Sequence, residues 1–574
     1  MQSHESPARE TAVPWPTSPF AWGLLVAACC VALLALGPVY DTNDDPAIVE
    51  LLSGAAGKAF DAAYLGSPLS SALRGLYAAF PAVPWYGLLI ASCNALSAGL
   101  WGSLIASCQL RPIPRLTATA GLLIGCSYLM LRVNFMAASF SLFLAATAWL
   151  WKLQTERGEV HRRQAWLGVA MGLAHMIRPS LQWLLLFFAL PCLGVSAGGR
   201  NARRLLLVGA CAGALVLVTT DGERRRHAEP GAKALATFNR ARSALVDIPR
   251  DPTPAALAAA GWSLGDYELA VRFGMYDEEL YRAERVRAFL AAAKRAPWFE
   301  RRARTARSYL LGRFHLVCLA ALLCVLWTLR KGGSDRGVAW PPCSVRALVW
   351  VWVAAGTIAL VVTRFPPRAF VPLYLYLGAL ASLVPPPIPR AAPPRPATGI
   401  ARAVALGVVT ALLSFVLVFW VADARAGRTR LEADLREAAV AAVAAGPDTI
   451  LIPVGLALET QYTAALAPPA RPALPLTPPG GWVVATPAFE DFLGKTGFMS
   501  GRAFMQGLAG DRRMVFAVRR ARQPDAQWLV ERLADRYTPG RRLSIEPLGG
   551  LPDGPGLLFF RIRGDNDQAP PGVL

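Results

Sequence analysis

Apolar stretches of about 20 residues recur along most of the chain and alternate with polar loops. An α-helix of that length crosses the hydrocarbon core of a bilayer, so the pattern predicts an all-α polytopic membrane protein. We count eleven spans, and Arg178-Pro179-Ser180 separates two short ones that could instead form one broken helix and leave ten. The predicted spans are 20–40, 85–108, 116–132, 135–151, 165–178, 181–197, 205–220, 309–328, 346–363, 369–385 and 402–422.

The basic residues of the short loops predict the orientation. With eleven spans, five loops rich in Arg and Lys fall on one side, which the positive-inside rule makes cytoplasmic. The tail 1–19 is then inside, whereas loops 41–84 and 221–308 and the residues after 423 are outside. With ten spans the later loops would change sides and the basic bias would be lost. These basic residues are Arg111, Arg115, Lys152, Arg157, Arg162, Arg163, Arg200, Arg203, Arg204, Arg330, Lys331, Arg336, Arg390 and Arg395.

Three outer regions follow from this orientation. Loop 41–84 is amphipathic, and we expect its apolar residues to lie on the membrane surface. Loop 221–308 has mostly helical patterns. Residues 424–574 predict a small α/β domain outside the membrane, after the membrane domain 20–423. The apolar residues of the first loop are Leu51, Leu52, Leu69, Leu73, Leu76 and Tyr77, and the C-terminal elements are helices at 430–445 and 524–536 and β-like runs at 449–454, 482–485, 514–518 and 557–562.

Composition narrows the class of protein further. The chain has 574 residues, 54% of them hydrophobic, and a net charge of +21. Much of the positive charge lies between apolar spans, where it meets lipid headgroups, and no basic face with interleaved aromatic residues indicates nucleic acid as a partner. Nearly all of the ten cysteines fall in apolar spans or at their ends, so we expect neither a disulfide framework nor a cysteine metal site. The first apolar run lacks an Ala-x-Ala cleavage site, so we expect a retained anchor.

An acidic pair, Asp44 and Asp45, follows the first span directly, within Asp41-Thr42-Asn43-Asp44-Asp45-Pro46. The plain interpretation is that Asp45 caps a helix beginning at Pro46 and that Asp44 is solvated. The functional interpretation is general-base chemistry on a sugar or lipid hydroxyl, or a divalent cation such as Mg²⁺ or Mn²⁺ that holds a phosphate.

Three arginines are predicted on the same side of the membrane as this pair. Arg178 lies at the outer ends of the fifth and sixth spans, and Arg364 and Arg368 flank a Pro-Pro turn between the ninth and tenth. Guanidinium groups bind phosphate bidentately, so these residues are candidates to hold a lipid phosphate. The alternatives are snorkelling to headgroups for Arg178 and an interfacial anchor for the other two.

Two aromatic residues of the long outer loop, Trp262 and Tyr267, are candidates to stack on a sugar. They could equally form the hydrophobic core of the loop, because large aromatic side chains dominate such cores. No phosphate-binding glycine loop and no metalloprotease, kinase or serine-hydrolase signature is present.

Taken together, these features resemble the GT-C superfamily of polyprenyl-phosphate-dependent glycosyltransferases. The superfamily includes protein mannosyltransferases, the aminoarabinose transferases of lipid A and oligosaccharyltransferase catalytic subunits. Within it, the chain is similar to a set of bacterial membrane proteins in the stretches Thr42-Asn43-Asp44-Asp45, Leu52-Ser53-Gly54, Leu76-Tyr77 and Pro84-Trp85-Tyr86. The resemblance implies that Asp44 is the proposed base and Asp45 its partner. The acceptor-binding Trp-Trp-Asp motif of oligosaccharyltransferases is absent.

We therefore expect a glycosyltransferase that moves a sugar from a polyprenyl-phosphate donor to a cell-envelope acceptor on the outer face of a bacterial inner membrane. The expected partners are membrane lipids and the lipid-linked sugar, and the sequence indicates neither a definite cofactor nor an oligomeric state. One alternative is a transporter or flippase, which predicts charges inside the spans and paired half-repeats. Another is a non-catalytic envelope assembly protein, in which Asp44 and Asp45 would tolerate substitution.

Overall fold

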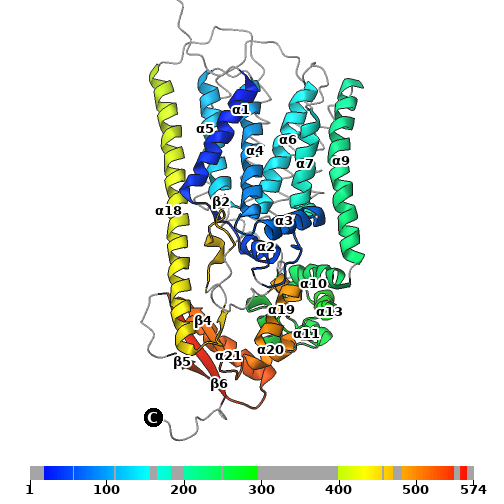
Figure 1. The fold of residues 1–574 in the computed structure, drawn as a ribbon, viewed down its shortest axis with the longest axis vertical. Coiled ribbons are helices and arrows are strands. Elements are labelled where there is room, and N and C mark those ends of the chain that lie inside the picture. The colour runs from blue at the N-terminus through cyan, green and yellow to red at the C-terminus, as the bar shows by residue number, and fades with distance from the viewer. Residues whose placement is uncertain are drawn as a thin grey trace, which may run out of the picture.

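The computed structural model describes residues 18–55, 57–108, 112–155, 164–181, 199–228, 230–246, 250–294, 399–454, 458–469, 481–548 and 556–564. Long helices run side by side and form a bundle, and shorter elements gather at one end of it (Figure 1). The predicted spans 309–328, 346–363 and 369–385, and span 181–197 beyond its first residue, lie outside the described residues, as do Arg364 and Arg368.

The bundle helices coincide with predicted spans. Within the described residues, four stretches are long and apolar enough to cross a membrane, namely Pro19–Leu36, Trp85–Ser107, Phe135–Leu153 and Ala202–Ala228. The last bundle helix continues to Ala445, so the predicted domain boundary at 424 falls inside one element. The helices are α1 (Pro19–Leu33, extended by the 3-10 turn Leu34–Leu36), α4 (Trp85–Ser107), α5 (Pro112–Leu131), α6 (Phe135–Thr155), α7 (Ala165–Ile177), α9 (Gly199–Ala228) and α18 (Gly399–Ala445).

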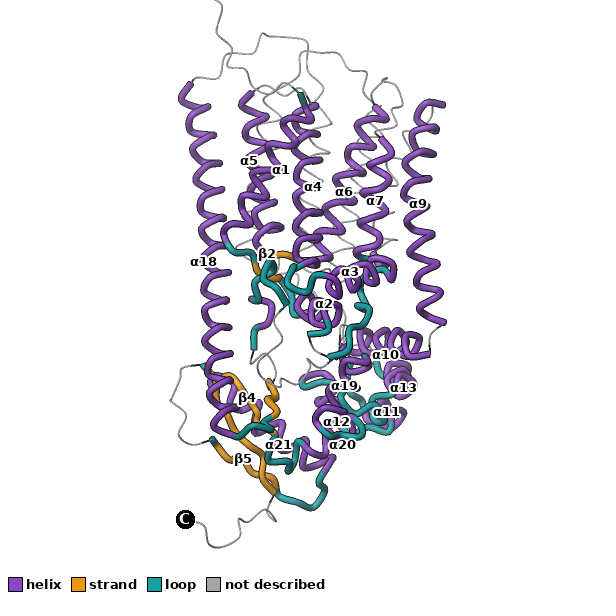
Figure 2. Tube along the Cα trace, in the orientation of Figure 1, coloured by secondary structure: helices purple, strands orange, loops and turns teal. Residues whose placement is uncertain are grey.

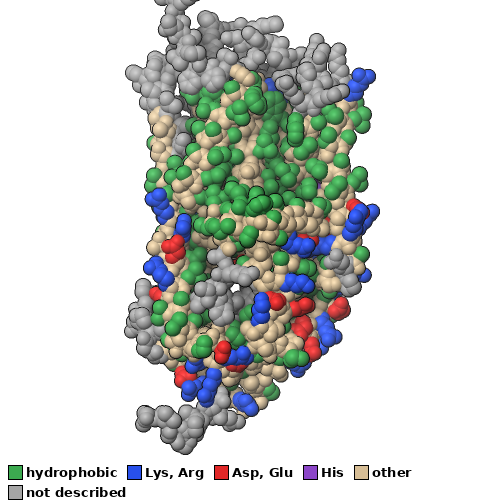
Figure 3. Space-filling view, viewed as in Figure 1, with side chains coloured by type: hydrophobic (Ala, Val, Ile, Leu, Met, Phe, Trp, Pro, Cys, Tyr) green, Lys and Arg blue, Asp and Glu red, His purple; other side chains and the backbone are tan. Residues whose placement is uncertain are grey.

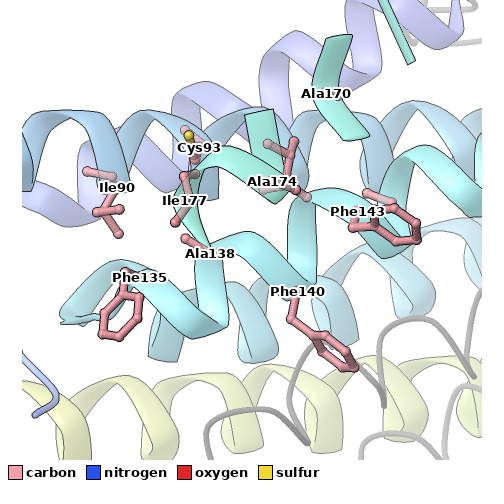
Figure 4. Close-up of a cluster of buried hydrophobic side chains, with 14 of the residues drawn as sticks. Ile90, Cys93, Phe135, Ala138, Phe140, Phe143, Ala170, Ala174 and Ile177 are labelled. Carbon is pink, nitrogen blue, oxygen red and sulfur yellow. The ribbon is translucent and has the colours of Figure 1, made fainter. Parts of the chain in front are cut away.

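Small residues allow the bundle helices to approach closely. A Cβ atom added at Gly23 of α1 would lie 2.7 Å from the carbonyl oxygen of Gly99 on α4, and one added at Gly172 of α7 would lie 2.5 Å from Leu215 of α9. Such contacts are typical of helices that pack in a membrane. The interior between α4, α6 and α7 is filled with apolar side chains (Figure 4). On the face drawn in Figure 3, hydrophobic side chains cover the bundle, and most charged ones gather over its lower end.

Two short helices, α2 (Asp44–Ser53) and α3 (Ser67–Ala79), lie across that lower end (Figure 2). The strands β1 (Val39–Tyr40) and β2 (Arg132–Val133) pair in parallel beside them. The expectation that the apolar residues of this loop lie on the membrane surface is wrong for most of them. Leu51, Leu52, Leu73 and Tyr77 are at most 3% exposed and belong to the core, because α2 and α3 close the end of the bundle.

In its described residues 230–246 and 250–294, the loop after α9 forms four helices and packs on the C-terminal region. As predicted, it is mostly helical, and α12 begins with a capping box between Ser263 and Asp266. Salt bridges and hydrogen bonds join it to α21, including Arg532 to Glu268 at 2.8 Å. The helices are α10 (Pro230–Val246), α11 (Pro254–Ala260), α12 (Leu264–Arg272) and α13 (Ala283–Ala292).

A four-stranded sheet of order β3-β4-β6-β5 forms the C-terminal region. The pair β3–β4 is parallel and the other two pairs are antiparallel. The run 482–485, which we predicted as β-like, is a 3-10 turn, and β5 was not predicted. The elements are β3 (Ile450–Pro453), α19 (Pro487–Thr496), α20 (Gly501–Gly507), β4 (Met514–Arg519), α21 (Gln523–Tyr537), β5 (Leu543–Pro547) and β6 (Leu557–Gly564). This region lies at the same end of the bundle as α2, α3 and α10 (Figures 1 and 2).

Candidate functional site

The carboxylate of Asp45 is fully buried and accepts four hydrogen bonds. Oδ1 accepts from the Tyr86 hydroxyl at 2.7 Å and from the Phe135 backbone N–H at 3.2 Å. Oδ2 accepts from the Thr42 hydroxyl at 2.6 Å and from Asn134 Nδ2 at 2.9 Å. These donors come from the start of α4, the start of α6 and the segment before α2, so Asp45 joins three parts of the fold at the lower end of the bundle.

This geometry corrects the expectation that Asp45 caps a helix at Pro46. Helix α2 begins two residues earlier, at Asp44, and its N-cap residue is Asn43, whose side chain makes no capping bond. A capping role does belong to a neighbour, since Asn134 Oδ1 accepts from the N–H groups of Met136 and Ala137 at the start of α6. The chain thus uses an asparagine to begin α6 and, with the same side chain, to hold Asp45.

Asp44 has different surroundings from those of Asp45. It is the first residue of α2 and is partly exposed, and successive helical residues point about 100° apart around the axis. The positive end of the helix dipole favours negative charge at this position. A partly exposed carboxylate can be reached by a substrate hydroxyl, which a general base requires.

Arg178 lies close to the Asp45 network. It ends α7, and its guanidinium carbon stands 4.5 Å from the ring centroid of Tyr64 and 5.2 Å from that of Phe135. The two rings are stacked, with centroids 5.9 Å apart and planes at 16°. The backbone N–H of Phe135 donates to Asp45, so Phe135 contacts both the predicted arginine and the predicted carboxylate. The cation–π contacts hold the guanidinium at the end of the bundle that carries α2.

A second arginine, Arg242 of α10, lies at this place and was not among the residues predicted from the sequence. Its Nη2 donates to the Tyr64 hydroxyl at 3.2 Å and to Asn239 Oδ1 at 3.2 Å. Tyr64 therefore receives one guanidinium on its ring face and another at its hydroxyl. No local signal separates Arg242 from the exposed Arg240 on the same helix, because only the fold brings α10 to Tyr64.

Trp262 and Tyr267 are parts of the loop's hydrophobic core. Trp262 is 5% exposed, packs against Tyr281 and Phe289, and donates its indole N–H to the carbonyl of Leu280 at 2.9 Å. Tyr267 stacks on Phe289 and donates its hydroxyl to the carbonyl of Arg250. Trp262 leaves no ring face for a sugar, so the core interpretation replaces the stacking interpretation there.

The described residues around Asp45 do not form a set of ligands for a metal ion. Among the described residues, no three His, Cys, Asp or Glu side chains are grouped so that they could hold a metal ion. Both oxygens of Asp45 already accept two hydrogen bonds each, whereas a hard cation needs several oxygen ligands. The alternative of a cation-binding acidic pair therefore does not fit Asp45.

Comparisons with known proteins give one structural match. No protein-family model matches the chain, and no curated protein matches it. Among solved structures, the chain is similar to the crystal structure of ArnT from Cupriavidus metallidurans in the apo state, at 13% sequence identity and a TM-score of 0.40. The match covers 94% of this chain and 97% of that one. At this sequence identity and TM-score, neither a family nor a residue role passes from ArnT to this chain.

Proposed function

We propose that the protein is a membrane glycosyltransferase that takes a sugar from a polyprenyl-phosphate donor and transfers it to a cell-envelope acceptor on the outer face of a bacterial inner membrane. The observation that carries the proposal is that Phe135 contacts both Asp45, through its backbone N–H, and Arg178, through its ring. Asp44 directly precedes Asp45 in the chain, and Arg242 contacts Tyr64, as Arg178 does. Transfer from a lipid phosphate needs a base for the acceptor and cations for the leaving phosphate.

In the proposed reaction, Asp44 takes the proton from an acceptor hydroxyl. The hydroxyl oxygen bonds to the anomeric carbon of the sugar as the bond from that carbon to the phosphate oxygen breaks, and the configuration is inverted. Arg178 and Arg242 stabilise the negative charge that the departing polyprenyl phosphate acquires. Asp45 does not react, because four donors occupy it, and it fixes the start of α2 instead.

The roles of Arg364 and Arg368 remain a proposal from the order of the predicted spans. If the loop that holds them lies on the outer side, as the eleven-span order predicts, they would add positive charge to the same donor phosphate. Their contribution is separable from that of Arg178 and Arg242, because each arginine can be replaced singly.

The experiment is a transfer assay with the purified protein in lipid nanodiscs. A panel of radiolabelled polyprenyl-phosphate sugars is the donor, and bacterial envelope membranes supply the acceptor. We expect the wild type to transfer label from at least one donor, and Asp44→Asn to reduce the rate by at least about 100-fold, the lower range for general acid–base catalysis. Asp221→Asn, at an exposed carboxylate of the same end, is the matched control and should be active. Full activity of Asp44→Asn would rule out the proposed base and favour a non-catalytic role.

A further inference from the structure

Residues 458–469, here called the strap, connect the C-terminal sheet to the bundle. Leu458 is 7% exposed and packs in the hydrophobic cluster of the sheet with Leu451 and Val515. Ala465 is completely buried and belongs to the core of the bundle. The strap therefore places one residue in the hydrophobic cluster of the sheet and another, Ala465, in the core of the bundle.

The strap pairs with the segment that leads into α2. Val39 forms an antiparallel bridge with Ala464, the N–H of Tyr40 donates to the carbonyl of Thr463 at 3.3 Å, and the N–H of Ala465 donates to the carbonyl of Pro38 at 2.9 Å. The strap thus continues the β2–β1 pair on its other side. A side-chain bond, from the Thr460 hydroxyl to Asn43 Oδ1 at 3.3 Å, reaches the residue directly before Asp44.

Two glycines leave room for the strap. At Gly87, near the start of α4, the three atoms nearest to an added Cβ all belong to Ala465 and Leu466, and the carbonyl oxygen of Ala465 would overlap with it. At Gly427 of α18, the three nearest atoms all belong to the ring of Tyr462, which would overlap as well. That ring also lies 4.8 Å from the guanidinium carbon of Arg132, which is ion-paired with Asp423.

We infer that the strap is a positioning element for Asp44, so that the C-terminal region is needed for sugar transfer and not for donor binding. The inference rests on the proposed function, since it takes Asp44 as the base. The Asp45 network holds the start of α2 on one side, and the strap holds the segment 38–43 on the other. A misplacement of about 1 Å at a reacting group can slow catalysis by about 100-fold. The donor arginines contact Tyr64 and Phe135 instead, so their function can be measured separately.

The test uses Gly87→Ala and Gly427→Ala, with Gly75→Ala on α3 as the matched control, because a Cβ at Gly75 meets nothing within 4 Å. Alanine generally stabilises a helix interior relative to glycine, so a loss at the first two positions is attributable to the strap. Each full-length variant is measured for hydrogen exchange at residues 38–45 and 460–469, for binding of polyprenyl phosphate in detergent, and for transfer.

We expect faster exchange in both segments, phosphate binding within about twofold of wild type, and transfer slower by at least about tenfold, while Gly75→Ala behaves as wild type. Transfer at the wild-type rate despite faster exchange would overturn the inference, and so would a parallel loss of binding and transfer. Unchanged exchange in both variants would show that the strap is not seated as described. A different result would show that the proposed function is wrong: the wild type would not transfer sugar, while hydrogen exchange would still be faster in Gly87→Ala and Gly427→Ala.

Discussion

At the scale of single residues, the adjacent Asp44 and Asp45 have different surroundings, from which we propose different roles. Asp45 is completely buried with four donors, whereas Asp44 is partly exposed at the start of α2. The acidic pair could be found in the sequence, because it follows the first span. The difference between their surroundings could not be predicted from the sequence. Tyr86 and Asn134 lie far along the chain, and only the fold brings them to Asp45.

Asp45→Asn should therefore destabilise the protein, by about 2–4 kcal/mol, since an amide nitrogen would face hydrogen-bond donors and leave at least one of them buried without an acceptor. Asp44→Asn should change the stability by at most about 1 kcal/mol, mainly through the lost interaction with the helix dipole. Thermal unfolding of the two variants in detergent checks this. Equal melting temperatures would contradict the division of roles.

Glu50 of α2 should make stability depend on pH. Burial raises the pKa of its carboxyl group from 4.5 to about 7. Below pH 4.5 the group is protonated in both states. Between pH 4.5 and 7 the folded state retains a proton that the unfolded state releases, so stability falls as the pH rises through this window. In Glu50→Gln this loss is absent, and the variant should gain up to about 3 kcal/mol over wild type at pH 8 and nothing at pH 4. Parallel melting curves of both proteins across this range would refute the assignment.

At the scale of elements, the lengths of the apolar stretches predicted where the helices lie, but they did not predict what the helices contact. Spans such as 85–108 and 135–151 correspond to α4 and α6, because about 20 apolar residues in a row leave the backbone few alternatives in a membrane. The surface assignment of Leu51 and Leu73 failed because an amphipathic helix buries its apolar face against protein as readily as against lipid. The β-like run 482–485 failed because a few apolar residues do not distinguish a strand from a 3-10 turn.

The contact between α12 and α21 should be stabilised by charge. Glu268 accepts hydrogen bonds from Trp528 Nε1 at 3.1 Å and Arg532 Nε at 2.8 Å. Arg532→Glu should destabilise the protein by about 1–3 kcal/mol, and Glu268→Arg in the same chain should restore part of the loss, with a coupling energy of about 1 kcal/mol. Thermal unfolding of the double-mutant cycle measures this. Arg512→Glu, at an exposed arginine before β4, is the control and should have little effect. Strictly additive changes would show that the pair does not couple.

At the scale of the whole molecule, the span order predicted that three regions lie on one side of the bundle, and the structure places them at one end. Loop 41–84, the loop after α9 and the C-terminal region lie at one end of the bundle, as the eleven-span order predicts (Figure 1). No sequence pattern indicated that the C-terminal strap would reach β1, since contacts such as the Val39–Ala464 bridge and the bond from the Tyr40 hydroxyl to the Ala465 carbonyl, 425 residues away, leave no local trace. The same holds for the contact of Arg242 with Tyr64, which depends on where α10 lies.

The central claim is that Arg178 and Arg242 form, around Tyr64, a site for a lipid phosphate. It is tested most directly by native mass spectrometry of polyprenyl phosphate bound to the wild type, Arg178→Ala, Arg242→Ala and the control Arg240→Ala. A charge-assisted hydrogen bond contributes about 1.5–3 kcal/mol, so each of the first two variants should bind at least about tenfold more weakly, and Arg240→Ala should bind as the wild type does. Undiminished binding by both Arg178→Ala and Arg242→Ala would contradict the account.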